Sequence, residues 1–162
     1  MKINTDRITE IIDNFLEQFG LTCFCGTDYG YYRNTDEIEY CLVTTERYDR
    51  LWLEYLRNRY GSEIDVDFYP IFVWSLLHEV GHSQTEMLFS GEGRAIIDEY
   101  KQSLDGDSEE DTLLYFNAPD ENVATFWAFD YIRHNPEEVE QLSIDLATAF
   151  EDFYNEYGIK EN

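Results

Sequence analysis

The segment that most constrains the fold is a strongly apolar stretch, residues 70–89. It begins with a proline, which fits the first position of a helix, and its spacing predicts one long helix. The longest apolar run here, Tyr69 to Leu77, is far too short to span a bilayer. A helix this apolar is normally buried. We therefore expect one domain, residues 1–162, with this helix in its core, because 162 residues is the size of a single domain.

The rest of the chain predicts a mostly helical α+β domain. Apolar residues at helical spacing predict further helices, and a short sheet is expected ahead of residues 70–89. The helices are expected at 5–19, 45–60, 95–104, 117–134 and 136–157. Strands are expected at 21–25 and 38–43, and we expect them to pair as a small antiparallel sheet. Residues 105–111 hold five acidic residues out of seven and are expected to form a solvated loop.

The net charge excludes two classes of partner. The chain carries 35 acidic and 11 basic side chains, a formal net charge of -24. Such a charge repels nucleic-acid phosphates and anionic membrane surfaces, so we expect neither as a partner. The N-terminus lacks the apolar core of a secretion signal. We expect a cytoplasmic protein whose cysteines are reduced: Cys23, Cys25 and Cys41.

The helix at 70–89 also carries the sequence H-E-V-G-H, residues 78–82. Residues four apart lie on the same helix face, so His78 and His82 can direct two imidazole nitrogens at one ion, about 2.0–2.1 Å away if it is zinc. Glu79 lies close enough to take a proton from an attacking water. Gly81 weakens a helix, which indicates that another segment approaches closely here. The motif predicts a Zn²⁺ site.

A catalytic zinc site needs a third protein ligand and one open position. Glu121 is the best candidate, because Ala124 and Ala128 follow it on one helical face. Small residues on that face would let this helix lie close to the one that carries the two histidines. Glu86 shares their stripe but is too far along the helix axis, so it is expected near the site or in solvent. The competing third ligands are Asp98, Glu99, Asp120 and His134.

Together, His78-Glu79-Val-Gly-His82 and Pro119-x-Glu121-x-x-Ala124-x-x-Trp127-Ala128 carry a resemblance. They resemble the small gluzincin-type metallopeptidases, which include the ImmA/IrrE-like proteins of bacteria, phages and mobile elements. The resemblance implies a zincin-like fold with a small sheet packed on the HExxH helix. It also implies zinc held by His78, His82 and Glu121, Glu79 as general base and acid, and hydrolysis of peptide bonds. The 38 residues between His82 and Glu121 exceed the spacing of the smallest relatives.

Peptide hydrolysis makes two further demands on the chain. The oxyanion that forms on the scissile carbonyl needs a donor, and the candidates are Tyr115, Tyr131 and His134. The substrate is expected to be a polypeptide, with basic sequences favoured by the negative charge of the protein. An edge strand at 38–43 would hold an extended substrate by main-chain pairing.

Two other functions remain open from the sequence. One is a zinc-binding interaction module without peptidase activity, since Glu79 alone does not establish catalysis. The other is an acidic decoy that mimics DNA, which would need carboxylates in phosphate-like rows over most of the surface. The observed clustering of acids at 105–111 and on the polar faces of helices is instead typical of solvation.

Overall fold

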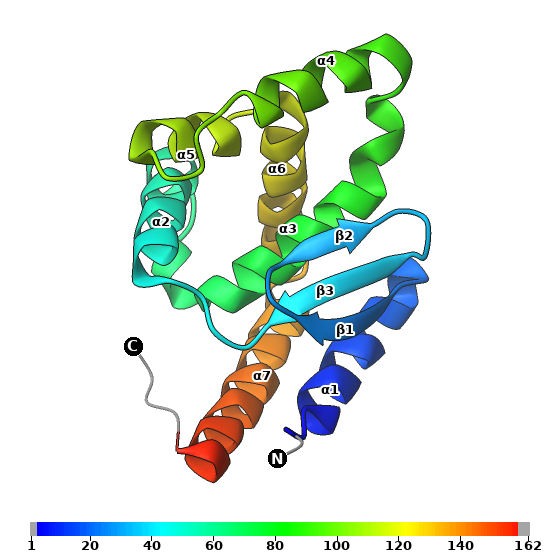
Figure 1. The fold of residues 1–162 in the computed structure, drawn as a ribbon. Coiled ribbons are helices and arrows are strands. Elements are labelled where there is room, and N and C mark those ends of the chain that lie inside the picture. The colour runs from blue at the N-terminus through cyan, green and yellow to red at the C-terminus, as the bar shows by residue number, and fades with distance from the viewer. Residues whose placement is uncertain (1–2, 159–162) are drawn as a thin grey trace.

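A computed structural model describes residues 3–158 of the chain. These residues form seven α-helices and one small sheet, and Figure 1 shows their arrangement. The helices are α1 (Asp6–Leu16), α2 (Glu46–Tyr60), α3 (Ile71–Thr85), α4 (Gly91–Gln102), α5 (Glu109–Phe116), α6 (Pro119–His134) and α7 (Pro136–Tyr157). The strands are β1 (Thr22–Gly26), β2 (Gly30–Tyr32) and β3 (Glu37–Cys41). Single 3-10 turns lie at Glu17–Phe19, Val66–Phe68 and Glu86–Leu88. The prediction of a mostly helical α+β domain is confirmed.

Helix α3 lies at the centre of the fold. Residues Val73 to Gly81 of this helix are all buried, in agreement with its apolar sequence. α6 crosses α3 on one side, while β2 and β3 contact it on another. The crossing is close at Gly81, where an added Cβ would lie 2.3 Å from the backbone oxygen of Ala124. The small residues Ala124 and Ala128 are fully buried there, so both sequence indications of a close helix pair are confirmed.

The sheet is mixed, so the prediction of an antiparallel sheet is wrong. Its strand order is β1-β3-β2, with β1 parallel and β2 antiparallel to β3. The error arose because β2 lies in the turn-like stretch between the two predicted strands, and its return leaves β3 running in the same direction as β1. The strand expected at 38–43 is consequently the central one, and β1 and β2 are the edges. The carboxylate of Glu39 on β3 accepts hydrogen bonds from the amides of Thr27 and Asp28, which holds the β1–β2 connection across the end of the sheet.

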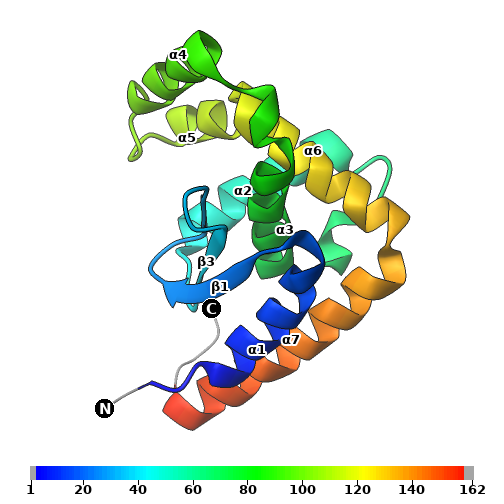
Figure 2. The ribbon, with the colours of Figure 1, turned by 90° about the vertical axis from the view of Figure 1, so that its right-hand side faces the viewer.

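The two ends of the domain are built differently (Figure 2). At one end α1 packs against β1 and α7, and its inward face carries Ile8, Ile12, Phe15 and Leu16. At the other end α4 and α5 lie beyond the crossing of α3 and α6, and no residue of α4 is buried. Helix α4 therefore lies outside the hydrophobic core.

Helix termini mostly follow the sequence signals. Gly20 has a left-handed φ of 70° after the first helical segment, and the Thr45 hydroxyl accepts the Tyr48 amide at the start of α2. The acidic stretch departs from expectation, because α5 begins inside it. Ser108 caps this helix, and three acidic residues, Glu109 to Asp111, occupy the first turn. The helix dipole favours anions at that position, so they belong to a helix start rather than a loop.

None of the helices described is both long and apolar enough to cross a membrane. Cys23, Cys25 and Cys41 are free thiols, as expected. Burial raises the pKa of the Cys41 thiol to about 12, so this group stays protonated at neutral pH.

Candidate metal centre

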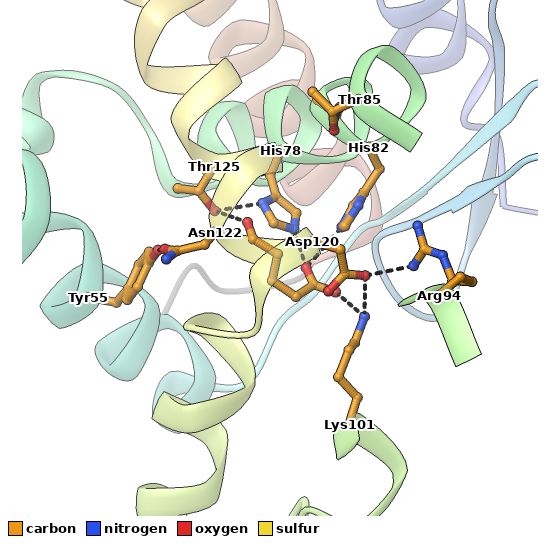
Figure 3. Close-up of polar contacts among 11 residues, drawn as sticks. Tyr55, His78, His82, Thr85, Arg94, Lys101, Asp120, Asn122 and Thr125 are labelled. Carbon is orange, nitrogen blue, oxygen red and sulfur yellow. Dashed lines mark hydrogen bonds and ion pairs between the residues drawn. The ribbon is translucent and has the colours of Figure 1, made fainter. Parts of the chain in front are cut away.

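His78, His82 and Glu121 converge at the crossing of α3 and α6. Figure 3 shows the two histidines side by side on α3. The Oε2 atom of Glu121 lies 2.8 Å from Nε2 of His78 and 2.9 Å from Nε2 of His82. His78 and Glu121 are buried, and His82 is partly buried. The crossing therefore brings two imidazoles and one carboxylate from remote parts of the sequence to one point.

Thr125, one turn after Glu121 on α6, sets the orientation of His78. Its hydroxyl donates to the backbone oxygen of Glu121 at 2.9 Å, and Nδ1 of His78 lies 2.9 Å from the same hydroxyl. Because the hydroxyl has one proton to give, Nδ1 of His78 must be the donor in the second contact. A metal bound at Nε2 needs a His78 whose single proton is on Nδ1, and the contact with Thr125 favours that tautomer.

Charge pairing stabilises the ionised forms of two of these groups. Burial alone would raise the pKa of Glu121, but the hydrogen bonds to His78 and His82 hold it well below its usual range. For His82 the signs are reversed. Burial acts to lower its pKa, but the contact with Glu121 has the larger effect and raises the pKa above its usual value. The site therefore favours a carboxylate at Glu121 and positive charge beside it.

The donor set fits a divalent metal ion. One ligand atom from each of the three residues lies within 4.8 Å of the other two. Two imidazole nitrogens and one carboxylate oxygen are a ligand set that zinc accepts, with room for one more ligand. Around a tetrahedral zinc, ligand atoms at about 2.0–2.1 Å from the ion are about 3.3 Å apart. Small side-chain shifts at the two short contacts would be enough to admit the ion.

Glu79 lies beside this cluster, and a cavity of about 560 Å³ opens in front of both. The carboxylate of Glu79 is nearly buried, and this burial raises its pKa. A carboxylate with a raised pKa exchanges protons more readily near neutral pH, which suits a general base and acid. The other lining residues come from the β1–β2 connection, from β2 and the turn after it, from α2, from the 3-10 turn after α3, and from the segment from α4 to α6. They include Asp28, Tyr31, Tyr48, Trp52, Glu86, Asp98 and Tyr115.

Among the described residues, none of the competing third ligands predicted from sequence belongs to the cluster of His78, His82 and Glu121. Asp120 is buried beside Glu121 but is paired with Lys101 and Arg94, and Asp98 lines the cavity and lies 3.6 Å from Arg94. Glu99 is exposed on α4. His134 is exposed near the end of α6, where its ring nitrogen contacts the Asp130 backbone oxygen. Glu121 is the candidate that the structure brings to the histidines.

The three oxyanion candidates differ in whether they line the cavity. Tyr115 lines the cavity, with its ring 4.9 Å from the ammonium of Lys101. The Tyr131 hydroxyl instead donates to Glu138, and neither Tyr131 nor His134 is among the residues that line the cavity. Sequence reasoning missed Tyr48, which lines the cavity from α2. No motif marks it, since only the fold brings α2 to the site.

Lys101 and Arg94 are the other residues that the sequence did not reveal. The ammonium of Lys101 lies 2.7 Å from Oε1 of Glu121 and 2.9 Å from Oδ2 of Asp120. Arg94 reaches the same Asp120 oxygen at 3.0 Å. Both cations project from α4 toward the start of α6, as Figure 3 shows. In sequence they look like ordinary charges on the polar face of a helix.

Comparison with known proteins adds no relative. A scan of protein families, a search of curated proteins and a search of solved structures each found no match. The function is therefore inferred from this site.

Proposed function

We propose that the protein is a zinc-dependent metallopeptidase of zincin-like architecture. The observation that carries the proposal is the convergence of His78, His82 and Glu121 on one point, beside Glu79 and at the wall of an open cavity. His78, His82 and Glu121 would hold the zinc. When bound, zinc would supply a water of lowered pKa and polarise the scissile carbonyl.

Glu79 would act as the general base and acid. It lines the same cavity as His78 and His82, and its raised pKa suits both proton uptake and release. It would accept the proton of the attacking water and deliver it to the leaving amine.

Tyr48 and Tyr115 are the groups available to stabilise the oxyanion. Burial raises the pKa of both phenols, and the nearby carboxylates of Glu79 and Glu121 raise it further. Both hydroxyls therefore stay protonated at neutral pH and can donate a hydrogen bond. We propose these two rather than Tyr131 and His134, because both line the cavity.

The substrate would be a polypeptide bound in extended form. The edge strand beside the site is β2, whose residues Gly30 and Tyr31 line the cavity, so the pairing expected for residues 38–43 is proposed for β2 instead. The net charge of -24 would speed the approach of basic substrates, an effect that added salt should weaken.

The test combines metal analysis with proteolysis assays on the wild type, Glu79→Gln and Glu121→Ala. Glu79→Gln keeps the shape of the side chain but cannot serve as a base, so we expect full zinc content and loss of activity. Glu121→Ala should lose both, because it removes a ligand. His134→Asn is the control, since this exposed histidine lies outside the cavity.

A wild type that binds no zinc would refute the proposal. Zinc binding without hydrolysis of any peptide in a broad library would refute the peptidase activity and favour the zinc-binding interaction module. Activity that survives in Glu79→Gln would refute the assigned base.

A further inference from the structure

The two oxygens of the Glu121 carboxylate have different neighbours. Oε2 faces the two histidines, whereas Oε1 lies 2.7 Å from the ammonium of Lys101. A free carboxylate can bind a metal through one oxygen or through both. Here one of the two oxygens is already held by a cation.

Lys101 is itself held in place. Oδ2 of Asp120 lies 2.9 Å from the ammonium, and Arg94 lies 3.0 Å from the same oxygen. Asp120 is 2% exposed, and its other oxygen, Oδ1, has no hydrogen-bond partner among the described residues. Burying a carboxylate in this way costs free energy unless it is paired, so Asp120 depends on its two cations.

Two cations of α4 lie against two carboxylates of α6. Lys101 pairs with Asp120 and Glu121, and Arg94 pairs with Asp120 and with Asp98 on its own helix. In a chain with only 11 basic residues, two of them project from α4 onto the first turn of α6. Ion pairs that only joined α4 to α6 would not need to contact a candidate metal ligand, yet Lys101 contacts Glu121.

We propose that Lys101 is a positioning residue that reserves Oε1 of Glu121, so that Oε2 alone serves as a ligand atom for the metal. This inference rests on the proposed zinc site. Single-oxygen ligation by Glu121 leaves more of the coordination sphere open to water and substrate. The ammonium also draws electron density from the carboxylate, which makes Oε2 a weaker donor and leaves the metal more electrophilic.

The test reads the coordination of Co²⁺ in place of zinc, by its visible absorption, in the full chain. The variants are Lys101→Met, which removes the charge and keeps most of the side-chain volume, and Lys101→Arg, which keeps a cation. We expect the wild type and Lys101→Arg to show the intense bands of a four-coordinate ion. Lys101→Met should show weaker bands, because Oε1 becomes free to bind and the coordination number rises.

Arg94→Met is the matched control. Arg94 lies on the same helix and contacts the same Asp120 oxygen, but its ion pairs are with Asp98 and Asp120 and not with Glu121. The Arg94→Met variant should weaken the attachment of α4 in a similar way and leave the Co²⁺ absorption bands unchanged. If Lys101→Met does not fold, Lys101→Ala serves in its place, with the same expected loss of intensity.

The outcomes separate this inference from the proposed function. Bands that are the same in Lys101→Met, Lys101→Ala and the wild type would overturn the role of Lys101 and leave the zinc site intact. An equal change in Arg94→Met would also overturn it, because the effect would then come from a weakened attachment of α4 to α6. A wild type that binds no Co²⁺ and no zinc would overturn both. Weaker bands in Lys101→Met support the role of Lys101 even in a protein without peptidase activity.

Discussion

The crossing of α3 and α6 and the outer helix α4 are held in the fold by different forces. At the crossing, buried side chains pack so closely that Gly81 touches the backbone of α6. Helix α4 instead buries no residue, and charged groups attach it to α6. The residues proposed to hold the metal lie on the packed part, and the cation that contacts one of them lies on the charge-held part. The packing of α3 against α6 sets the positions of the proposed ligands. The ion pair with Lys101 would decide which oxygen of Glu121 is available to the metal.

The same substitution at two helical glycines should separate the two regions most strongly. In Gly81→Ala the new Cβ would meet the Ala124 backbone oxygen at 2.3 Å, so we expect a loss of about 3 kcal/mol in the free energy of unfolding. In Gly93→Ala on α4 the new Cβ meets nothing within 4 Å, and alanine favours the helix by about 0.5–1 kcal/mol. Urea denaturation of both variants measures the difference. Equal destabilisation would show that α4 is packed as tightly as the crossing.

A pair of threonine substitutions extends the comparison to metal binding. Thr125→Val removes the hydroxyl that accepts the Nδ1 proton of His78, and we expect zinc affinity to fall by about 10- to 100-fold. Thr112→Val on α5 removes a similar hydroxyl, which donates to the backbone oxygen of Ser108 at 2.8 Å. This control should leave zinc affinity unchanged. Zinc titration calorimetry measures both, and an unaltered affinity in Thr125→Val would contradict the orienting role.

A pH change should act on the crossing with opposite signs for metal binding and stability. The folded pKa of His82 lies above its usual value, because the contact with Glu121 outweighs the effect of burial. Protonated His82 cannot bind zinc, so from pH 8 to pH 6 the apparent affinity should fall, by up to about 10-fold per pH unit for one proton.

The metal-free chain should respond in the other direction. A raised folded pKa contributes stability that is present below the unfolded pKa of His82 and lost as the pH rises through the folded one. Glu121, whose folded pKa is lowered, stays ionised throughout this range. Thermal melts of the metal-free chain should therefore show lower stability at pH 8 than at pH 6. His134→Asn should leave both trends unchanged, and their persistence in His82→Asn would assign them to another group.

Local and helical signals in the sequence were sufficient for most of the fold. Helical periodicity predicted α1, α2, α3, α6 and α7, and the small residues Gly81, Ala124 and Ala128 indicated the close crossing from the sequence alone. The contact between Glu121 and the two histidines followed from the same reasoning. These features are encoded within one or two helices, where spacing fixes which side chains share a face.

The features that were missed depend on how separate segments meet. The parallel pairing of β1 and β3 cannot be read from the strands, because it depends on the short β2 between them. The roles of Lys101, Arg94 and Tyr48 depend on where α4 and α2 lie relative to α6, and no spacing rule links these segments. Helix α5 was not predicted, because its first turn lies in the acidic stretch, and an acidic helix terminus and an acidic loop have the same composition.

The strand order β1-β3-β2 also dictates how the sheet is assembled. The central strand is the last of the three in the chain, and the two edge strands pair only with it. No sheet exists until residues 37–41 are available, and the β2–β3 hairpin, closed by a short turn, is the first pair within reach. From the cost of loop closure we expect β1 to join the far side of β3 after this hairpin has formed. The β2 wall of the cavity would then be in place before the first strand of the chain joins the sheet.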